Sequence, residues 1–339
     1  MQAAQPELAP ISPQARIYDV FNGDADGICA LHQLRLAYPK DTVLITGVKR
    51  DVDLLRRLPG NERMEVTVLD VSLDANVDAL RRILDVGGEV TWFDHHSANR
   101  AFPHPCLRLF WDDAPDVCTS ILVDRHLQGR FRGWAVAAAF GDNLPASGRS
   151  LATGLGLDER SVCALADLGQ LLNYNAYGES VEDLHVAPDM LYRSLHQFAD
   201  PFDFITTSPY YRLLAEGYQH DAACIERLTP YWHSAAGAVY ILPPAQWARR
   251  ISGIFANKLA ATEDKRSYAV LTERADGSYV VSVRSGQPAT HAANGLCERF
   301  ATGGGRKTAA GINNLPAAEL DNFIKAFSDY FITGETCAR

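Results

Sequence analysis

The chain has 339 residues, of which 47% are hydrophobic, and a formal net charge of −9 at pH 7. This length and apolar content suffice for two domains with cores of their own. The longest near-continuous apolar run, WAVAAAF, is far too short to span a membrane. The negative charge argues against a protein that follows long nucleic acid by general electrostatics, and short or small anionic substrates fit it better.

The N-terminal residues lack the basic and apolar segments of a secretion signal. We therefore expect residues 1–15 to form a disordered leader and the protein to be cytoplasmic. The seven cysteines include no C-x-x-C pair. This spacing indicates neither a zinc ribbon nor a disulfide framework, but reduced thiols that serve mostly as small core residues.

Apolar segments rich in Val, Ile and Thr alternate with helical stretches in the N-terminal half. The predicted strands are RIYDVF, TVLITGV, EVTVLD and EVTWFD. The predicted helices between them are Ile28–Tyr38, Val52–Leu58 and Asn76–Val86. Alternation at this pitch predicts a mostly parallel, doubly wound sheet. After FDHH the pattern becomes helical, and we expect helices over Val117–Leu127, Gly133–Phe140 and Glu159–Leu172.

A second unit is predicted towards the C-terminus. Residues 186–211, which are rich in Pro, Asp, Thr and Ser, favour a linker. Beyond them lie a strand, AVYILP, a helix around Ile251–Ala261 and a hairpin that turns at Asp276 and Gly277. We therefore expect an α/β protein with a first domain over residues 16–185 and a smaller mixed α/β domain over residues 212–335.

The segment FNGDADGICA places Asn22, Asp24 and Asp26 at alternate positions just before Gly27. An EF-hand calcium loop has oxygen ligands at this spacing. A calcium loop is disfavoured, because Gln33 replaces the closing glutamate and RIYDVF is not an amphipathic helix. The pattern instead predicts a strand that ends in carboxylates, where open α/β sheets bind their ligands.

Acidic and imidazole side chains follow two further predicted strands, so they gather at the same edge of the sheet. These residues are Asp70 after VTVL, and Asp94, His95 and His96 after VTWF; Asp142 follows the helix WAVAAAF and can reach the same edge. Carboxylates with one or two imidazoles suit manganese, magnesium or iron better than a metal that demands thiolates. Two such ions about 3.5–4 Å apart would activate water and neutralise a phosphate under attack.

Each of these residues also has an ordinary structural interpretation. An aspartate at a strand end often caps the next helix, and adjacent histidines are commonly a partly exposed pair without a ligand. Taken together, however, carboxylates that converge on one edge repel one another unless cations compensate them. The whole set therefore favours a metal site.

These motifs resemble the DHH phosphoesterase family, which is named after the triplet seen here as Asp94-His95-His96. GDADG is similar to the first family motif, Asp70 to the second and Asp142 to the fourth, and the resemblance covers nearly the whole chain. VSVRSG, HAANGLCERF and GGGRKTAAG look like the glycine-rich, DHH-associated C-terminal subdomain of the nanoRNase or oligoribonuclease-like branch. The resemblance implies an active site in the cleft between a DHH domain and this subdomain.

The resemblance also implies two divalent metal ions, with manganese expected and magnesium or iron as alternatives. Asp24 would bind one ion, and Asp26, His95 and Asp142 would bind the other. Asp70 would bridge the two ions, which together would activate water for in-line attack on phosphorus.

The remaining motif residues are implied to act on the substrate. His96 would contact the scissile phosphate, Asp94 would orient the neighbouring imidazoles, and Arg284 would hold a phosphate through its forked donors. The other candidates for substrate binding are Ser285, Asn294, Gly303, Gly304, Gly305, Arg306 and Lys307. Alternatively, the glycines form a flexible turn before the final helix, and Arg284 pairs with an acid at the surface.

The chain departs from the family pattern at two positions. Val20 stands where many nanoRNase-like members have a histidine, so the first ion has one ligand fewer unless Asn22 contributes its amide oxygen. Arg306 replaces the histidine that usually follows the three glycines. With Lys307 it offers permanent positive charge, which suits a strongly anionic substrate end such as a 5′-phosphate.

We therefore expect a phosphodiesterase that cuts short linear 5′-phosphorylated oligonucleotides, such as pGpG or pApA, to mononucleotides. Its partners would be short RNA or dinucleotides, without long duplexes or membranes, and a homodimer stays open. The alternatives are a RecJ-like single-strand exonuclease, a 3′-phosphoadenosine 5′-phosphate phosphatase, a cyclic-dinucleotide phosphodiesterase and a non-catalytic nucleotide-binding regulator. RecJ-like members usually add an OB-type domain and cyclic-dinucleotide members a membrane or sensor segment, and the sequence shows neither.

Overall fold

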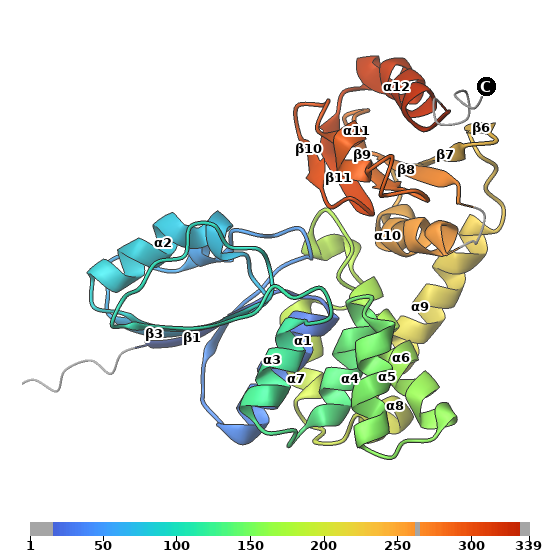
Figure 1. Ribbon diagram of the computed structural model, residues 1–339. Coiled ribbons are helices and arrows are strands. Elements are labelled where there is room, and N and C mark those ends of the chain that lie inside the picture. Colours follow the sequence, from blue (N-terminus) through green and yellow to red (C-terminus); the bar gives the residue numbers. More distant parts are fainter. Residues whose placement is uncertain (1–15, 262–264, 333–339) are drawn as a thin grey trace, which may run out of the picture.

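The structure is a computed structural model that describes residues 16–261 and 265–332, arranged as two α/β units (Figure 1). The expected leader, residues 1–15, lies outside the described residues. No helix within the described ranges is long and apolar enough to cross a membrane.

A five-stranded parallel sheet forms the first unit. Its strands are β1 (Arg16–Phe21), β2 (Val43–Ile45), β3 (Met64–Leu69), β4 (Glu89–Asp94) and β5 (Leu107–Trp111). They follow the order β2-β1-β3-β4-β5, and every neighbouring pair is parallel. The predicted doubly wound sheet is thus confirmed. Strand β5 was not predicted, because LRLFW is short and only partly buried, and β2 is shorter than the apolar run around it.

Helices cover both faces of this sheet. Helix α2 (Leu73–Asp85) packs on one face, and α1 (Ala25–Ala37) and α3 (Thr119–His126) lie on the other (Figure 1). Helix α1 begins earlier than expected, because the Asp24 carboxylate accepts hydrogen bonds from the amides of Asp26 and Gly27, both at 3.1 Å. A Cβ atom on Gly27 would lie 2.2 Å from the Asn22 carbonyl oxygen, so the tight turn requires glycine.

Further helices extend the first unit beside the sheet. They are α4 (Arg132–Gly141), α5 (Pro145–Gly154), α6 (Glu159–Tyr174), α7 (Pro188–Leu195), α8 (Pro201–Thr207) and α9 (Pro209–Ile225). Helices α4 and α6 confirm the predicted ones, whereas α5 was missed. Their apolar faces close a core with α1.

The predicted linker, residues 186–211, is wrong as a description of local structure, because it contains α7, α8 and the start of α9. Its three prolines, taken as loop signals, each occupy the first turn of one of these helices, where the missing N–H costs nothing. Leu191 and Phe204 are fully buried in the core of the first unit. The segment therefore belongs to that unit by its packing.

The second unit is a six-stranded mixed sheet with the order β10-β11-β9-β8-β7-β6. Its elements are β6 (Trp232–Ser234), β7 (Gly237–Leu242), α10 (Gln246–Ala260), β8 (Ser267–Glu273), β9 (Tyr279–Arg284), α11 (Ala293–Cys297), β10 (Gly303–Gly305), β11 (Ala309–Leu315) and α12 (Leu320–Ile332). The predicted hairpin is confirmed as β8 and β9, and Gly277 supplies the positive φ of 79° at its turn.

Buried ion pairs hold the two units together. Asp183 accepts two hydrogen bonds from the Arg249 guanidinium, at 2.8 and 2.7 Å. Asp221 of α9 accepts from Arg250 at 2.8 Å, and Tyr174 of α6 also donates to this carboxylate. Because both arginines belong to α10, this helix is fixed against α6 and α9, and the second sheet is placed over the carboxyl edge of the first.

The backbones of helices α4 and α6 are in direct contact with each other. A Cβ atom on Gly169 would lie 1.9 Å from the Ala137 carbonyl oxygen, and one on Gly141 would lie 2.7 Å from the Gly169 carbonyl oxygen. We expect Gly169→Ala to lower the free energy of unfolding by about 1–3 kcal/mol in urea denaturation, despite alanine's better helix propensity.

The matched control for this prediction is Gly60→Ala. Its added Cβ would meet only the Arg82 Nε atom, at 3.9 Å. We expect a change of less than about 0.5 kcal/mol for this variant. Equal losses of stability in the two variants would contradict the close helix contact.

Candidate metal centre and substrate cavity

The predicted metal ligands lie at the carboxyl edge of the first sheet. Asp24 and Asp26 follow β1, Asp70 follows β3, and Asp94 ends β4. All four residues are at least 98% buried. In the strand order β2-β1-β3, successive strands lie on opposite sides of β1, and such a switch point is where doubly wound sheets bind ligands.

Asp70 has an unusual backbone conformation. Its φ of 58° lies in the left-handed region, which costs a non-glycine residue about 1–2 kcal/mol. The strand hydrogen bond from its amide to the Phe93 carbonyl oxygen, at 3.0 Å, holds this turn in place. The carboxylate also accepts from the Thr119 hydroxyl at 3.2 Å. Strain maintained in this way at a cleft is typical of a functional residue.

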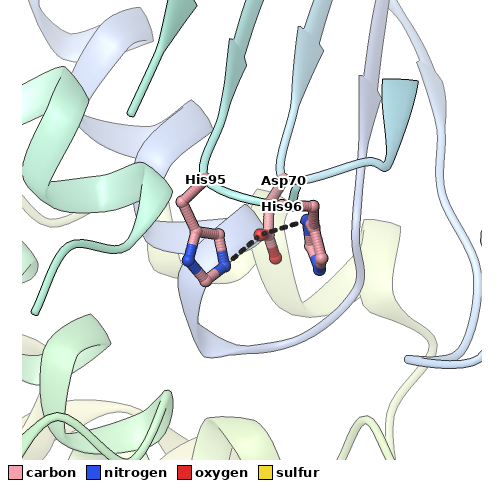
Figure 2. A group of neighbouring side chains, drawn as sticks. All are labelled: Asp70, His95 and His96. Carbon is pink, nitrogen blue, oxygen red and sulfur yellow. Dashed lines mark ion pairs between the residues drawn. The ribbon is translucent and has the colours of Figure 1, made fainter. Parts of the chain in front are cut away.

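His95 presents one nitrogen to the acidic cluster. Its Nδ1 donates to the Val117 carbonyl oxygen at 2.9 Å, which leaves Nε2 as the atom available to a metal. Nε2 lies 3.4 Å from Asp70, toward which it points in Figure 2. It also lies 3.7 Å from Asp142 and 3.9 Å from Asp26. The side chain is thus oriented as a metal-binding histidine requires.

Asp94 positions the neighbouring histidine. Its Oδ1 atom accepts from the His95 amide at 2.9 Å and from His96 Nδ1 at 2.7 Å. His96 is 37% exposed and lines the cavity, and Asp70 also lies 4.0 Å from its Nδ1 (Figure 2). Asp94 itself is fully buried, so its role as an orienting residue stays a prediction that this geometry favours.

The acids in the cluster disturb one another. Burial, and then the charge of Asp70, raise the pKa of Asp26 to about 7. Burial and the Asp26 charge raise the pKa of Asp142 to about 6. Burial lowers the pKa of His95, but its hydrogen bond to Asp70 and the surrounding charges outweigh burial and raise it to about 10. The cluster therefore takes up protons where no other cation balances its charge.

The donor set fits a divalent ion that prefers oxygen and imidazole ligands. Asp26, His95 and Asp142 offer ligand atoms within 4.8 Å of one another, and so do Asp70, His95 and His96. Asn22 lies beside them with its side-chain oxygen buried and without a hydrogen-bond partner in the described residues. The residues predicted to bind the second ion are thus brought together, and the number of ions stays a prediction.

Asp24 is engaged elsewhere, and sequence reasoning missed its partner, Lys49. The Lys49 ammonium forms an ion pair with Asp24. Lys49 belongs to none of the sequence motifs described above. It also donates to the side-chain oxygen of Asn173 at 3.0 Å. The only available signal was its position just after the second predicted strand, at the same edge of the sheet. Asp24 as a metal ligand therefore stays a prediction.

A cavity of about 700 Å³ lies next to the cluster and between the two units. Its floor includes Asp70, His95 and His96, and the second unit contributes Arg306 and Thr308. Its outer wall is the segment before α3, residues 113–117. Among the predicted substrate-binding residues, Arg306 borders this cavity, while Lys307 is exposed beside it.

Three other predicted substrate-binding residues are hydrogen-bonded within the second unit. Arg284 donates to the Asn257 side chain at 2.9 Å, and the Ser285 hydroxyl donates to the His291 carbonyl oxygen at 2.6 Å. Asn294 donates to Glu298 at 3.0 Å, and its side-chain oxygen is buried without a described partner. Their roles in binding stay predictions.

The glycine run has two different explanations. A Cβ atom on Gly303 would lie 1.8 Å from the Cys297 carbonyl oxygen, and Gly305 has a φ of 139° with the Ala310 Cα atom 2.5 Å from the Cβ position. Packing of β10 therefore requires these two glycines. Gly304 has nothing within 4 Å, so its backbone is the one that a ligand can approach.

Comparisons with known proteins agree with this architecture. Residues 235–333 match the DHHA1 domain. No curated protein matches the sequence of the chain. Similar solved structures include a RecJ exonuclease bound to manganese, at 18% identity and a TM-score of 0.56 over 94% of this chain and 90% of RecJ.

Two further structures share the fold. PggH, a pGpG-specific phosphodiesterase from Vibrio cholerae, is 14% identical, with a TM-score of 0.59 over 94% of this chain and 99% of PggH. A DHH domain described as a member of the s1p family of ribosomal proteins is 14% identical, with a TM-score of 0.59 over 93% of this chain and 86% of its own.

The first unit thus has an acidic carboxyl edge that could hold a metal ion, and the second unit contains the DHHA1 match. Over more than nine tenths of its length the chain shares the fold of the RecJ exonuclease and the PggH phosphodiesterase, and its C-terminal residues match the DHHA1 domain.

Asp142 offers a clean test of the metal cluster. It lies 3.7 Å from His95 and 3.9 Å from Lys49, and its side chain is 21% exposed. We expect Asp142→Asn to weaken manganese binding at least about tenfold in calorimetric titration, because a charged ligand is lost. Its metal-free stability should stay within about 0.5 kcal/mol of wild type or rise, since repulsion falls.

Asp51→Asn is the matched control for Asp142→Asn. Asp51 borders the same cavity, but it forms an ion pair with Arg57 outside the cluster. Manganese affinity should therefore be unchanged in this variant. An unchanged affinity in Asp142→Asn would remove Asp142 from the site.

The effect of manganese on stability should depend on pH. Asp26 and Asp142, with pKa values of about 7 and about 6, hold protons that the unfolded chain loses near pH 4. This contribution to stability is complete below roughly pH 4 and is lost as pH rises towards 7. The contribution of His95 is lost later, as pH rises from about 6.5 through about 10.

Manganese competes with these protons, so we expect the rise in Tm that it causes to grow from about pH 6 to about pH 8. Thermal unfolding in EDTA and in manganese chloride measures this rise. A rise of equal size at every pH would mean that the ion does not bind the titrating cluster.

Proposed function

We propose that this protein hydrolyses short linear 5′-phosphorylated oligonucleotides, and dinucleotides above all, to mononucleotides in a manganese-dependent reaction. The observation that carries the proposal is one cavity that has the metal cluster on one side and Arg306 on the other. A phosphodiester at the cluster can thus have a second, terminal phosphate at the arginine.

The size of the cavity favours a short substrate. A volume of about 700 Å³ is within the range of roughly 300–1,000 Å³ found for small-ligand sites. Phe, Tyr and Trp side chains, on which single strands usually stack, are not among the described residues that border it. Both features support a substrate of few nucleotides, held mainly through its phosphates.

The chain's own residues supply most of the positioning. Asp26, Asp70, His95 and Asp142 would hold the manganese ion, which supplies activated water and positive charge next to phosphorus. His96, fixed at Nδ1 by Asp94, keeps Nε2 for a phosphate oxygen. Burial lowers the pKa of His96, but its bond to Asp94 outweighs burial and raises it, so this imidazole is suited to donate a proton.

Arg306 would select the end of the substrate. It is exposed, and a guanidinium can contact two oxygens of a terminal phosphate at once, with a charge that does not titrate. The fold shared with PggH, described as pGpG-specific, supports the same substrate class. RecJ, described as an exonuclease, shares the fold equally, so long single strands belong in the test.

The first experiment is product analysis with manganese. It offers 5′-phosphorylated diribonucleotides, a five-mer, a long single DNA strand, 3′-phosphoadenosine 5′-phosphate and a cyclic dinucleotide. We expect fast loss of the dinucleotides with the long strand intact. In Arg306→Ala the KM for 5′-phosphorylated dinucleotides should rise at least about tenfold, as for loss of a charge-assisted hydrogen bond.

Matched substrates and variants separate the outcomes. Dinucleotides with a 5′-hydroxyl should show no change in KM in Arg306→Ala. Asp70→Gly removes a ligand while relieving the strain at its φ of 58°, so it should fold and lose activity at least about a hundredfold. Degradation of the long strand would contradict the proposed length limit, and turnover of none of the substrates would favour a nucleotide-binding regulator.

A further inference from the structure

Lys49 enters the metal cluster from the loop that follows the edge strand β2. Its amide donates to the Ala176 carbonyl oxygen at 2.9 Å, which ties the loop to the end of α6. Its ammonium donates to the side-chain oxygen of Asn173, also in α6, at 3.0 Å. The side chain is therefore held from two directions and directed into the cluster, where it borders the cavity.

The Lys49 ammonium lies between two carboxylates of the cluster. It forms an ion pair with Asp24 Oδ2 and lies 3.9 Å from Asp142 Oδ1. The other oxygen of Asp24 accepts from the amides of Asp26 and Gly27 at the start of α1. Both oxygens of Asp24 thus have partners.

The acidic neighbour of Asp24 is Asp70, which also belongs to the cluster around His95. Asp24 is in neither of the two groups of described side chains that could hold an ion. Val20, on the preceding strand, is fully buried in the apolar core on the α2 face of the sheet. Among the residues that the structure describes at the cavity, Asn22 has a buried side-chain oxygen without a hydrogen-bond partner.

We propose that the Lys49 ammonium takes the place of a second divalent ion, so that the centre consists of one metal ion and one lysine. The ion occupies the cluster of Asp26, Asp70, His95 and Asp142. Lys49 compensates the charge of Asp24 and closes that half of the site to metal.

The electrostatics of Lys49 are consistent with a permanent cation. Its ammonium is paired with the buried Asp24 carboxylate and lies 3.9 Å from Asp142. An ammonium has three donors. Two of them are used by Asp24 and Asn173, and the side chain remains 27% exposed on the cavity side. Because Lys49 borders the cavity, its charge would also lie close to a phosphate oxygen of a bound substrate.

This last consequence rests on the proposed function, whereas the number of ions does not. A lysine that replaces an ion contributes one charge instead of two, and its position is fixed by the chain. The protein would therefore need only one equivalent of metal for its full complement of active-site cations.

Manganese stoichiometry tests the proposal without substrate. We expect the purified full chain to bind one manganese ion in equilibrium dialysis and to give the resolved spectrum of an isolated ion in electron paramagnetic resonance. Lys49→Ala should bind a second ion at the freed Asp24, with weaker affinity and a spin-coupled spectrum. Two coupled ions in the wild type, or a single ion in Lys49→Ala, would overturn the proposal.

A charge-balanced double variant guards against loss of folding in Lys49→Ala. Asp24→Asn combined with Lys49→Met removes the ion pair without leaving an unpaired charge. It should still bind one ion with wild-type affinity, because the remaining cluster is intact. Loss of an ion relative to wild type would mean that Asp24 is a ligand and would overturn the proposal.

Turnover measurements keep this inference separate from the proposed function. Lys49→Arg retains the positive charge and should keep one ion and a larger share of kcat than Lys49→Met. A wild-type protein that binds one manganese ion but cleaves none of the oligonucleotides would contradict the proposed function and leave the lysine assignment standing.

Discussion

Mutual repulsion among buried carboxylates is the constraint on which this structure depends. Five aspartates from β1, β3, β4 and the end of α4 converge on one small volume from which water is largely excluded. In such surroundings like charges interact far more strongly than in water. Lys49 and two imidazoles lie among these carboxylates and can compensate their charge, and the same side chains could hold a divalent ion. The distribution of these cations then decides what the site can bind.

Several features of the fold bring these carboxylates together. The parallel sheet brings the carboxyl ends of β1, β3 and β4 to one edge. The glycine contact between α4 and α6 lets α4 reach that edge, and Asp142 follows directly after its last turn. The left-handed backbone of Asp70 turns its carboxylate between the histidine and the other acids. The ion pairs of Arg249 and Arg250 place the second unit as the roof of the cavity.

Much of this arrangement could be predicted because it follows from short sequence patterns within single strands and helices. The alternation of apolar runs and helical stretches indicates a parallel sheet, and acids after three strands indicate a shared edge. The helices α7 and α8 could not be predicted in the same way, since their prolines also signal loops. Lys49 was missed for a different reason. Its partner Asn173 lies 124 positions away, and no local pattern reports such a contact.

The substrate-binding residues illustrate the same limit. The glycine run is conspicuous in the sequence, yet tight packing explains Gly303 and Gly305 and leaves only Gly304 open. Arg306 and Lys307 are adjacent in sequence, but only Arg306 borders the cavity. Both distinctions depend on which way a turn points, and composition does not encode this direction.

The wall of the cavity is attached to two of the predicted metal ligands. Asp26 accepts the first two amides of α3, from Thr119 and Ser120, both at 2.7 Å, and His95 Nδ1 donates to the Val117 carbonyl oxygen. The segment of Asp113, Ala114, Pro115 and Val117, which borders the cavity, therefore ends on two side chains that we propose as metal ligands. Binding of an ion to Asp26 and His95 would in this way be mechanically linked to the shape of the cavity. An apoprotein with loosened ligands would lose not only its reactive ion but also the contour that distinguishes one substrate from another.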